Sequence, residues 1–161
     1  MRKIMAILLV LAIWAAPAWA KAPREGDPAP DFSLESVDGK TYSLSQFKGK
    51  VVVIGMFHIC VPCRNQALEF NATRDQIHSD QLVFLGINPS GDSRPDVEEY
   101  LKSFPQKVTF PYLLDPDQTV HKSYIQRDMP TVIIIGKDGT ISARTPAVTV
   151  EDLVPFLKKL L

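Results

Sequence analysis

The segment Val51–Arg64 reads VVVIGMFHICVPCR, in which a run of mostly apolar, largely β-branched residues leads into two cysteines spaced i, i+3. Cys60 and Cys63 are the two cysteines of the chain. The apolar run predicts a buried strand, and the residues after the cysteines can continue as a helix. Cys60 would then lie at the N-terminus of that helix, where free backbone N–H groups and the helix dipole favour a thiolate. The segment therefore predicts a redox site.

The residues that follow this segment predict a sheet. Leu82–Ile87 is a second continuous apolar run, and the helix-length stretch Arg64–Ser79 separates it from the first run. Continuous apolar strands joined through a helix are typical of a parallel sheet that is covered on both faces. We therefore expect a βαβ unit with the cysteines at its first turn.

Weaker signals complete the order of elements. Alternating apolar and polar residues predict an N-terminal hairpin from Asp31–Leu34 and Thr41–Leu44. Downstream, the pattern predicts an inserted helix at Ser93–Phe104 and a strand at Phe110–Leu113. It then predicts a short helix at Asp115–Tyr124, a second hairpin from Val132–Ile135 and Thr140–Ala143, and a last helix at Thr149–Leu161. The chain is thus predicted to be an α/β protein with a central mixed β-sheet flanked by helices.

Length and composition limit the classes of function. At 161 residues, 45% of them hydrophobic, the chain fits one domain with its own core. Eighteen basic residues balance eighteen acidic ones, so the charge does not indicate nucleic acid or an anionic membrane surface as a partner.

The first twenty residues have the features of a secretory signal peptide. A basic start, an apolar run, a helix breaker and a small-x-small cleavage site follow one another as Arg2-Lys3, Ile4–Ile13, Pro17 and Ala18-Trp19-Ala20. An uncleaved N-terminal anchor is the alternative, although the apolar run is shorter than the roughly 20 residues of a membrane-spanning helix. Either interpretation places the protein in the periplasm or another extracytoplasmic compartment, where it can hold a disulfide.

The predicted organisation is a signal peptide at 1–20, an extended lead-in at 21–30 and a folded domain at 31–161. The lead-in carries three prolines and a glycine, which suit an extended segment better than a packed element.

In this order of elements the chain resembles the thioredoxin superfamily, and more narrowly the exported thiol-disulfide oxidoreductases of the TlpA/ResA type, with a redoxin domain like that of the AhpC/TSA proteins. The resemblance is carried by Ala29-Pro30-Asp31-Phe32, Cys60-Val61-Pro62-Cys63, Met129-Pro130-Thr131 and Lys137-Asp138-Gly139. The first and last of these motifs are shared with peroxiredoxins. The CxxC pair followed by x-Pro-Thr before an apolar strand is the more specific combination.

The resemblance implies a thioredoxin-like fold and a substrate-binding segment at Met129, Pro130 and Thr131. In that fold Pro130 would be cis and lie beside the cysteines, with the backbone of Met129 free to pair with an extended substrate. One departure concerns Ile59, which stands where the family usually has a tryptophan.

Thiol-disulfide exchange needs an attacking thiolate, an open approach to it and a second sulfur that resolves the mixed disulfide. Cys60, at the helix end, is the expected nucleophile, and Cys63, one turn into the helix, is the expected resolving thiol. This chemistry needs no cofactor or metal beyond the Cys60–Cys63 disulfide. Inert core cysteines and a zinc site are the alternatives, but zinc usually takes four ligands and a second ligand pair at suitable spacing is missing from the sequence.

Three residues are candidates for tuning the acidity of the thiols. His58 stands two positions before Cys60, where an imidazolium could stabilise a thiolate or relay a proton; a ring in solvent or packed under the loop is the alternative. Pro62 stiffens the loop and removes a backbone donor. Glu69 is a weak substitute for the glutamate that TlpA/ResA-type proteins often carry at the position of Gln66, with a solvated helix face as the alternative.

The leading hypothesis is an exported thiol-disulfide oxidoreductase that acts on protein dithiols and disulfides. The resemblance implies re-reduction through a membrane electron carrier, and cytochrome c maturation is one such role. A thiol peroxidase is the first alternative, but the peroxiredoxin pattern P-x-x-x-T-x-x-C fails because Val53 and Phe57 stand where Pro and Thr are needed before Cys60. A copper chaperone that uses both cysteines and a histidine or methionine is the second.

Overall fold

The computed structural model describes residues 21–161. The predicted signal peptide or anchor at 1–20 lies outside the described residues. Within 21–161, none of the helices has the length and apolar character needed to cross a membrane.

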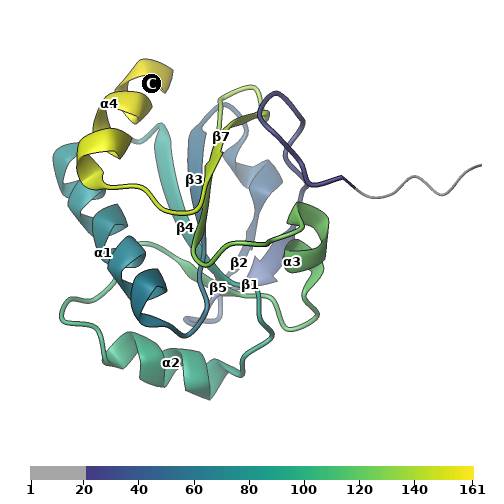
Figure 1. Cartoon of the computed structure of the whole chain (residues 1–161), viewed down its shortest axis with the longest axis vertical. Helices are drawn as coiled ribbons and strands as arrows, with labels where there is room; N and C mark the ends of the chain where they lie inside the picture. The colour runs from purple at the N-terminus through teal and green to yellow at the C-terminus, as the bar shows by residue number, and fades with distance from the viewer. Residues whose placement is uncertain (1–20) are drawn as a thin grey trace, which may run out of the picture.

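A five-stranded sheet in the order β5-β4-β3-β6-β7 forms the centre of the molecule (Figure 1). Its strands are β3 Val51–Met56, β4 Leu82–Asn88, β5 Tyr112–Leu114, β6 Thr131–Ile135 and β7 Ile141–Thr145. β3 pairs parallel with β4, and β4 with β5, whereas β6 pairs antiparallel with both β3 and β7. The predicted mixed sheet is therefore confirmed.

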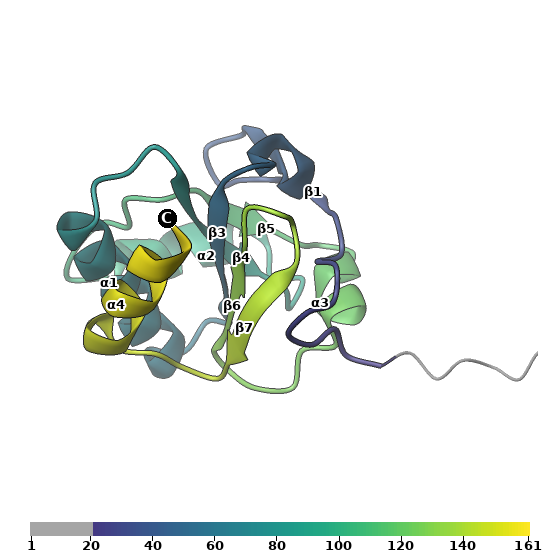
Figure 2. The ribbon, with the colours of Figure 1, turned by 90° about the horizontal axis from the view of Figure 1, so that it is seen from above.

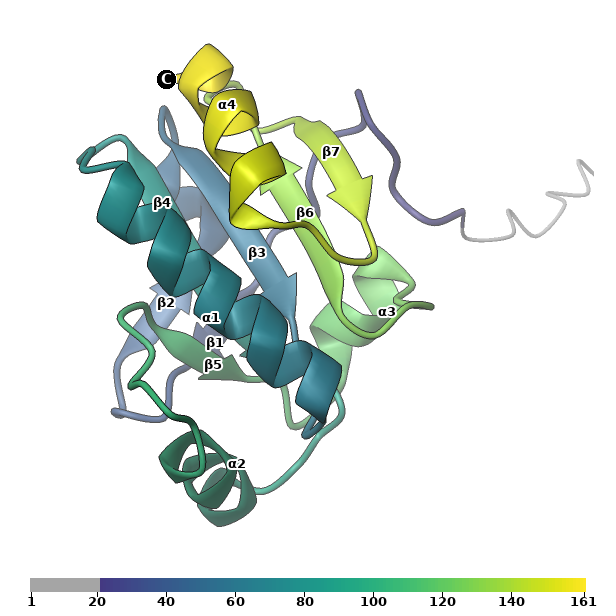
Figure 3. The same ribbon diagram turned by 60° about the vertical axis from the view of Figure 1, so that its left-hand side comes forward.

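Helices cover both faces of this sheet. Figures 2 and 3 show α1 (Val61–Gln76) and α4 (Val150–Leu160) on one face, while the short helix α3 (Thr119–Tyr124) lies on the other. The alternation of β3 explains the two cores, because Val51 and Val53 pack beneath α1 and α4, whereas Val52, Ile54 and Met56 face the α3 side. Burial on both faces is the reason why β3 has no polar position.

The N-terminal hairpin and the inserted helix lie at the β5 edge of the molecule. β1 (Ser33–Glu35) pairs antiparallel with β2 (Thr41–Ser43), and a single 3₁₀ turn η1 (Leu44–Phe47) follows. α2 (Arg94–Lys102) is the inserted helix. Arg94, at its start, donates to the carbonyl oxygens of Ser36 and Val37, which ties the helix to the end of the hairpin.

Two facing glycines make room for aromatic rings on the α1 side of the sheet. Gly55 of β3 pairs with Gly86 of β4. A Cβ atom at Gly55 would lie 2.0 Å from Cζ of Phe57, and one at Gly86 would lie 2.8 Å from Cδ2 of Tyr112. The two rings stack on each other with centroids 6.1 Å apart. Phe57 therefore lies over the end of β3 directly before the loop that carries the cysteines.

Residues 21–30 run beside β7 without helix. Gly26 N–H donates to Ile141 O, Ile141 N–H donates to Asp27 O, and Ala29 N–H donates to Gly139 O, at 2.9, 2.9 and 3.0 Å. The lead-in is thus fastened to the outer edge of the sheet.

The observed bounds differ from the predicted ones mostly at element ends. The predicted strand Phe110–Leu113 is shifted to Tyr112–Leu114, and the last strand runs to Thr145 rather than Ala143. Thr149 is the N-cap of α4 as predicted, but its hydroxyl contacts the Asp152 carboxylate and makes no hydrogen bond to a backbone N–H of the helix. The capping acceptor comes from α1 instead, as described below.

Candidate functional site

Cys60 occupies the N-cap of α1, directly after the loop that leaves β3. Its Sγ accepts a hydrogen bond from the backbone N–H of Cys63 at 3.3 Å, and Pro62 lies in the first turn, where its missing N–H costs no helical bond. An N–H donor and the positive end of the helix dipole both stabilise negative charge on this sulfur. The geometry at Cys60 is that expected of an attacking thiolate.

Cys63 is fully buried one turn further into the helix. Burial raises the pKa of the Cys63 thiol to about 12. The hydrogen bond to Cys60 and the charge of Cys60 add to this rise. The backbone N–H of His58 donates to Cys63 Sγ at 3.3 Å and opposes this rise. Cys63 therefore stays protonated at neutral pH, which suits a thiol that acts second.

Iodoacetamide should alkylate Cys60 and leave Cys63 unmodified at pH 7. Cys63 is inaccessible, and its raised pKa keeps it a thiol, whereas the thiolate is the reacting species. Peptide mass spectrometry after a timed reaction measures the two sites separately. Labelling of Cys63 should become appreciable only as the pH approaches 12, and equal labelling of both cysteines at pH 7 would contradict this assignment.

Tyr100 of α2 anchors the cysteine loop from the side. Its hydroxyl donates to the carbonyl oxygen of Cys60 at 2.6 Å, and the N–H of Arg64 donates to the same oxygen at 3.0 Å. Burial raises the pKa of Tyr100 to about 12, so the phenol remains a donor over the physiological range. Sequence reasoning missed this residue, although its spacing from Val97 and Phe104 already placed it on the inner face of the inserted helix.

The predicted proline loop enters β6 opposite the end of β3. The Met129–Pro130 peptide bond is cis, which confirms that prediction. Thr131 pairs with Met56, the last residue of β3, and its hydroxyl donates to Asp128 O at 2.7 Å. The strand register therefore brings the proline loop to the same end of the sheet as the loop that carries the cysteines.

Apolar side chains are exposed around this end of the sheet. Ile59, Val61 and Met129 expose 43, 58 and 57% of their surface, and they are the exposed large hydrophobic residues of the described chain. A shallow depression of about 410 Å³ continues from Ile59 along α2, lined also by Tyr100, Ser103 and the acidic Asp92, Asp96 and Glu99. The surface around Cys60 is thus open and partly apolar, as a docking polypeptide requires.

The ring of half-buried His58 contacts a residue that the sequence did not single out. Its Nε2 lies 3.3 Å from Oε1 of Gln126, which is 68 positions further along the chain. The contact that His58 makes with the cysteines is through its backbone N–H to Cys63. A role of the His58 ring in stabilising the Cys60 thiolate stays a prediction. Gln126 has no periodic or motif signal that could have identified it.

Gln66 and Glu69 connect α1 to the segment that begins α4. Gln66 donates to Val148 O at 2.9 Å and accepts from Val148 N–H at 2.8 Å, so its amide clamps this segment from both sides. Glu69 Oε2 accepts from the N–H of Val150 at 2.7 Å, at the first residue of α4. The Glu69 carboxylate therefore contacts α4. This contact explains the position of the side chain without a role at the thiols.

Replacing Glu69 with alanine should lower the free energy of unfolding by about 1–2 kcal/mol, because the N-terminus of α4 loses a charge-assisted acceptor. Urea denaturation at constant pH measures the change, and Glu69→Gln, which keeps an acceptor oxygen, should lose less. A Glu69→Ala protein with unaltered stability but altered Cys60 alkylation would instead favour the tuning role.

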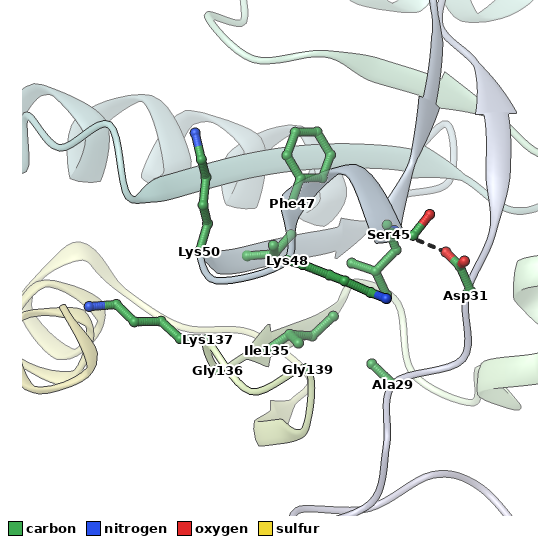
Figure 4. Close-up of a pocket in the computed structure, with 12 residues that line it drawn as sticks. Ala29, Asp31, Ser45, Phe47, Lys48, Lys50, Ile135, Gly136, Lys137 and Gly139 are labelled. Carbon is green, nitrogen blue, oxygen red and sulfur yellow. Dashed lines mark hydrogen bonds between the residues drawn. The ribbon is translucent and has the colours of Figure 1, made fainter.

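A separate hollow of about 160 Å³ lies near the opposite end of the sheet (Figure 4). Figure 4 shows the Lys48 side chain lying across it, while Lys50 and Lys137 point away from it. Its floor includes Val52 and Ile135, which pair near the beginning of β3. Because the cysteines follow the end of β3, this hollow is not part of their site.

Among residues 21–161, three or more His, Cys, Asp or Glu side chains nowhere come together in an arrangement that could hold a metal ion. Cys60 and Cys63 alone make a poor fit to zinc, which usually takes four ligands in structural sites.

The sheet order, the CxxC pair at a helix N-cap and the cis proline before β6 define a thioredoxin-like protein. Solved structures show the same fold. A protein from Chlorobium tepidum named as thiol:disulfide interchange protein DsbE superposes with a TM-score of 0.73 at 23% identity, covering 86% of this chain and 96% of that one.

Residues 25–144 match the AhpC/TSA family. The thiol-disulfide oxidoreductase ResA of Bacillus subtilis is 31% identical over 118 residues, which are 73% of this chain and 64% of that protein. A Mycobacterium tuberculosis protein named as a peroxiredoxin is 36% identical over 132 residues, covering 72% of this chain and 80% of that one. The chain belongs to the AhpC/TSA family, within which its relatives include proteins named as thiol-disulfide oxidoreductases.

Proposed function

We propose that this protein is a thiol-disulfide oxidoreductase that exchanges the Cys60–Cys63 dithiol with disulfides of other proteins. The observation that carries the proposal is the position of Cys60 Sγ, which accepts the Cys63 N–H at the N-cap of α1 in a partly exposed loop. The match to relatives named thiol-disulfide oxidoreductases supports it.

The exchange proceeds in two displacements. The Cys60 thiolate attacks one sulfur of the partner disulfide, which forms a mixed disulfide and releases the other partner sulfur as a thiolate. Cys63 then passes its proton to the partner thiolate that was released first and attacks Cys60 Sγ, which forms the Cys60–Cys63 disulfide and releases the second partner thiolate. Two electrons pass to the partner, and the protein's disulfide is the oxidised product, so no further cofactor takes part.

The substrate in this proposal is an extended polypeptide that carries a disulfide. It would lie against the exposed side chains of Ile59, Val61 and Met129 and pair with the backbone at Met129. We place the protein outside the cytoplasm, with a membrane electron carrier that reduces it again, and cytochrome c maturation is one role of this kind. These assignments rest on the signal-like sequence at 1–20 and on the resemblance to exported oxidoreductases.

Reduction of insulin by the purified chain, with dithiothreitol as electron donor, tests the proposal. We expect turnover well above the uncatalysed rate and a measurable reduction potential for the Cys60–Cys63 pair. A potential near −270 mV would indicate a reductant and one near −120 mV an oxidant, because these are the values of thioredoxin and DsbA.

A thiol peroxidase is the second candidate, because a relative at 36% identity carries the name peroxiredoxin. The residues that would have to be Pro and Thr are Val53 and Phe57, both buried in the core, and this argues against peroxide activation at Cys60. Consumption of hydrogen peroxide at a rate above that of insulin reduction would reverse the order of the two candidates.

A further inference from the structure

Gln126 is a buried amide just beyond the C-terminus of α3, and all of its hydrogen-bonding capacity is used. Only 8% of the residue is exposed. Its Nε2 donates to the carbonyl oxygens of Met56 and Asp128, at 3.4 and 3.1 Å. Its Oε1 lies 3.3 Å from Nε2 of His58 and 3.5 Å from Nδ1 of His121. The two donors and two acceptor positions of an amide are therefore all engaged.

The chemistry of these partners fixes the state of both histidine rings. The carbonyl oxygens of Met56 and Asp128 can only accept, so the NH₂ group of Gln126 must face them. Oε1 consequently faces both rings, and each ring must present an N–H to it. This assigns the proton to Nε2 in His58 and to Nδ1 in His121. In neutral His58, Nδ1 is then the unprotonated nitrogen.

The backbone directly before Gln126 is held in a costly conformation. Ile125 has φ 46°, in the left-handed region that β-branched residues rarely adopt. Arg144 of β7 donates to Tyr124 O at 2.6 Å and to Ile125 O at 3.0 Å, which stabilises the turn at the end of α3. Because Arg144 holds the strained Ile125 in place, we infer that the fold specifies this backbone position closely.

Both sides of the proposed active site meet at this one amide. On the cysteine side, Gln126 holds the ring of His58, whose backbone N–H donates to Cys63 Sγ. On the proline side, it donates to Asp128 O, the same oxygen that accepts from the hydroxyl of Thr131 directly after the cis proline. A shift of Gln126 would therefore move His58 relative to the Cys63 sulfur and loosen the loop that leads to Met129.

We propose that Gln126 is a positioning residue for thiol-disulfide exchange: it joins the cysteine loop to the cis-proline loop and fixes the tautomer of His58. It touches neither sulfur and acts through His58 and Asp128. The inference rests on the proposed function for its effect on rate, whereas its effect on the histidine rings stands independently of any activity.

Long-range ¹H–¹⁵N spectra of the histidine rings test the contacts directly in the wild-type protein. We expect the proton of neutral His58 on Nε2 and that of neutral His121 on Nδ1. Gln126→Leu removes all four contacts, so both rings should show mixed tautomers and kcat/KM for insulin reduction should fall about tenfold. Gln118→Leu is the matched control, because Gln118 flanks the other end of α3 and donates to Ser90 O; it should change neither readout.

Gln126→Glu separates the two halves of the proposal and serves if the leucine variant does not fold. A carboxylate can still accept from both rings but cannot donate to Met56 O or Asp128 O, so the tautomers should persist while the rate falls. Neutral His58 with its proton on Nδ1 in the wild type, or Gln126 variants with wild-type rates, would overturn the proposal. Wild-type protein with the expected tautomers but without disulfide reduction would refute the proposed function instead.

Discussion

Insulin reduction should fall by at least about a thousand-fold when Cys60 is replaced by serine, because a serine hydroxyl is not ionised at neutral pH and forms no disulfide. The N-cap position would still be occupied by a good capping residue, so the fold should be retained. The rate of insulin precipitation and a urea denaturation curve of the same sample measure activity and folding separately. Full activity in folded Cys60→Ser protein would remove Cys60 from the mechanism.

The matched variant Cys63→Ser should trap the protein in mixed disulfides with its substrates instead of preventing the first attack. Cys60 can still attack, but the mixed disulfide is no longer resolved, so covalent complexes with substrates should accumulate. Non-reducing electrophoresis detects these complexes, and dithiothreitol should separate them by reducing the mixed disulfide. Serine is close to cysteine in size, so the buried position of Cys63 is preserved. The trapped partners would identify the substrate proteins.

Gly55→Ala is expected to lower the free energy of unfolding by about 3 kcal/mol or more, because the new methyl group collides with the ring of Phe57. The ring cannot move freely, since it packs against Phe70 and Tyr112 with centroids 5.6 and 6.1 Å away. Urea denaturation measures the loss. The alkylation rate of Cys60 should change as well, because Phe57 is followed at once by the cysteine loop.

A double-mutant cycle distinguishes this collision from a general effect of substitution in β3. Phe57→Ala alone should cost about 3–5 kcal/mol through the cavity that it leaves. Combined with Gly55→Ala, the total should be clearly less than the sum of the single losses, because the collision is absent and the added methyl group fills part of the cavity. Additive losses would show that the ring of Phe57 is not what excludes a side chain at residue 55.

The centre of the fold was predictable because its signals are local and repeated. Val51–Met56 and Leu82–Asn88 are apolar at nearly every position, and burial on both faces leaves that pattern little ambiguity. The short edge strand at Tyr112–Leu114 was misplaced, since three residues carry too little pattern to set their limits. Thr149 was correctly predicted as the N-cap of α4, but the acceptor of the first helical N–H, Glu69, was not, because it is 81 positions before Val150.

In the candidate site, too, some residues were predictable from the sequence and others were not. Cys60, Cys63 and the cis Pro130 were predicted, because the spacing of the first two and the family resemblance for the third are readable in the sequence. Tyr100 and Gln126 could not be assigned to the site. Each acts on a backbone or ring far away in the sequence, and a hydrogen bond between distant residues leaves no periodic trace in a single chain.

The path of residues 21–30 along β7 has a consequence for association between molecules. An uncovered edge strand offers free N–H and C=O groups on which another chain can assemble. Here the lead-in occupies the N–H and C=O groups of Ile141, the first residue of β7. Pro23, Pro28 and Pro30 have no N–H, so the outward side of the segment has few donors for a further strand. Addition of another strand is thereby hindered where β7 begins.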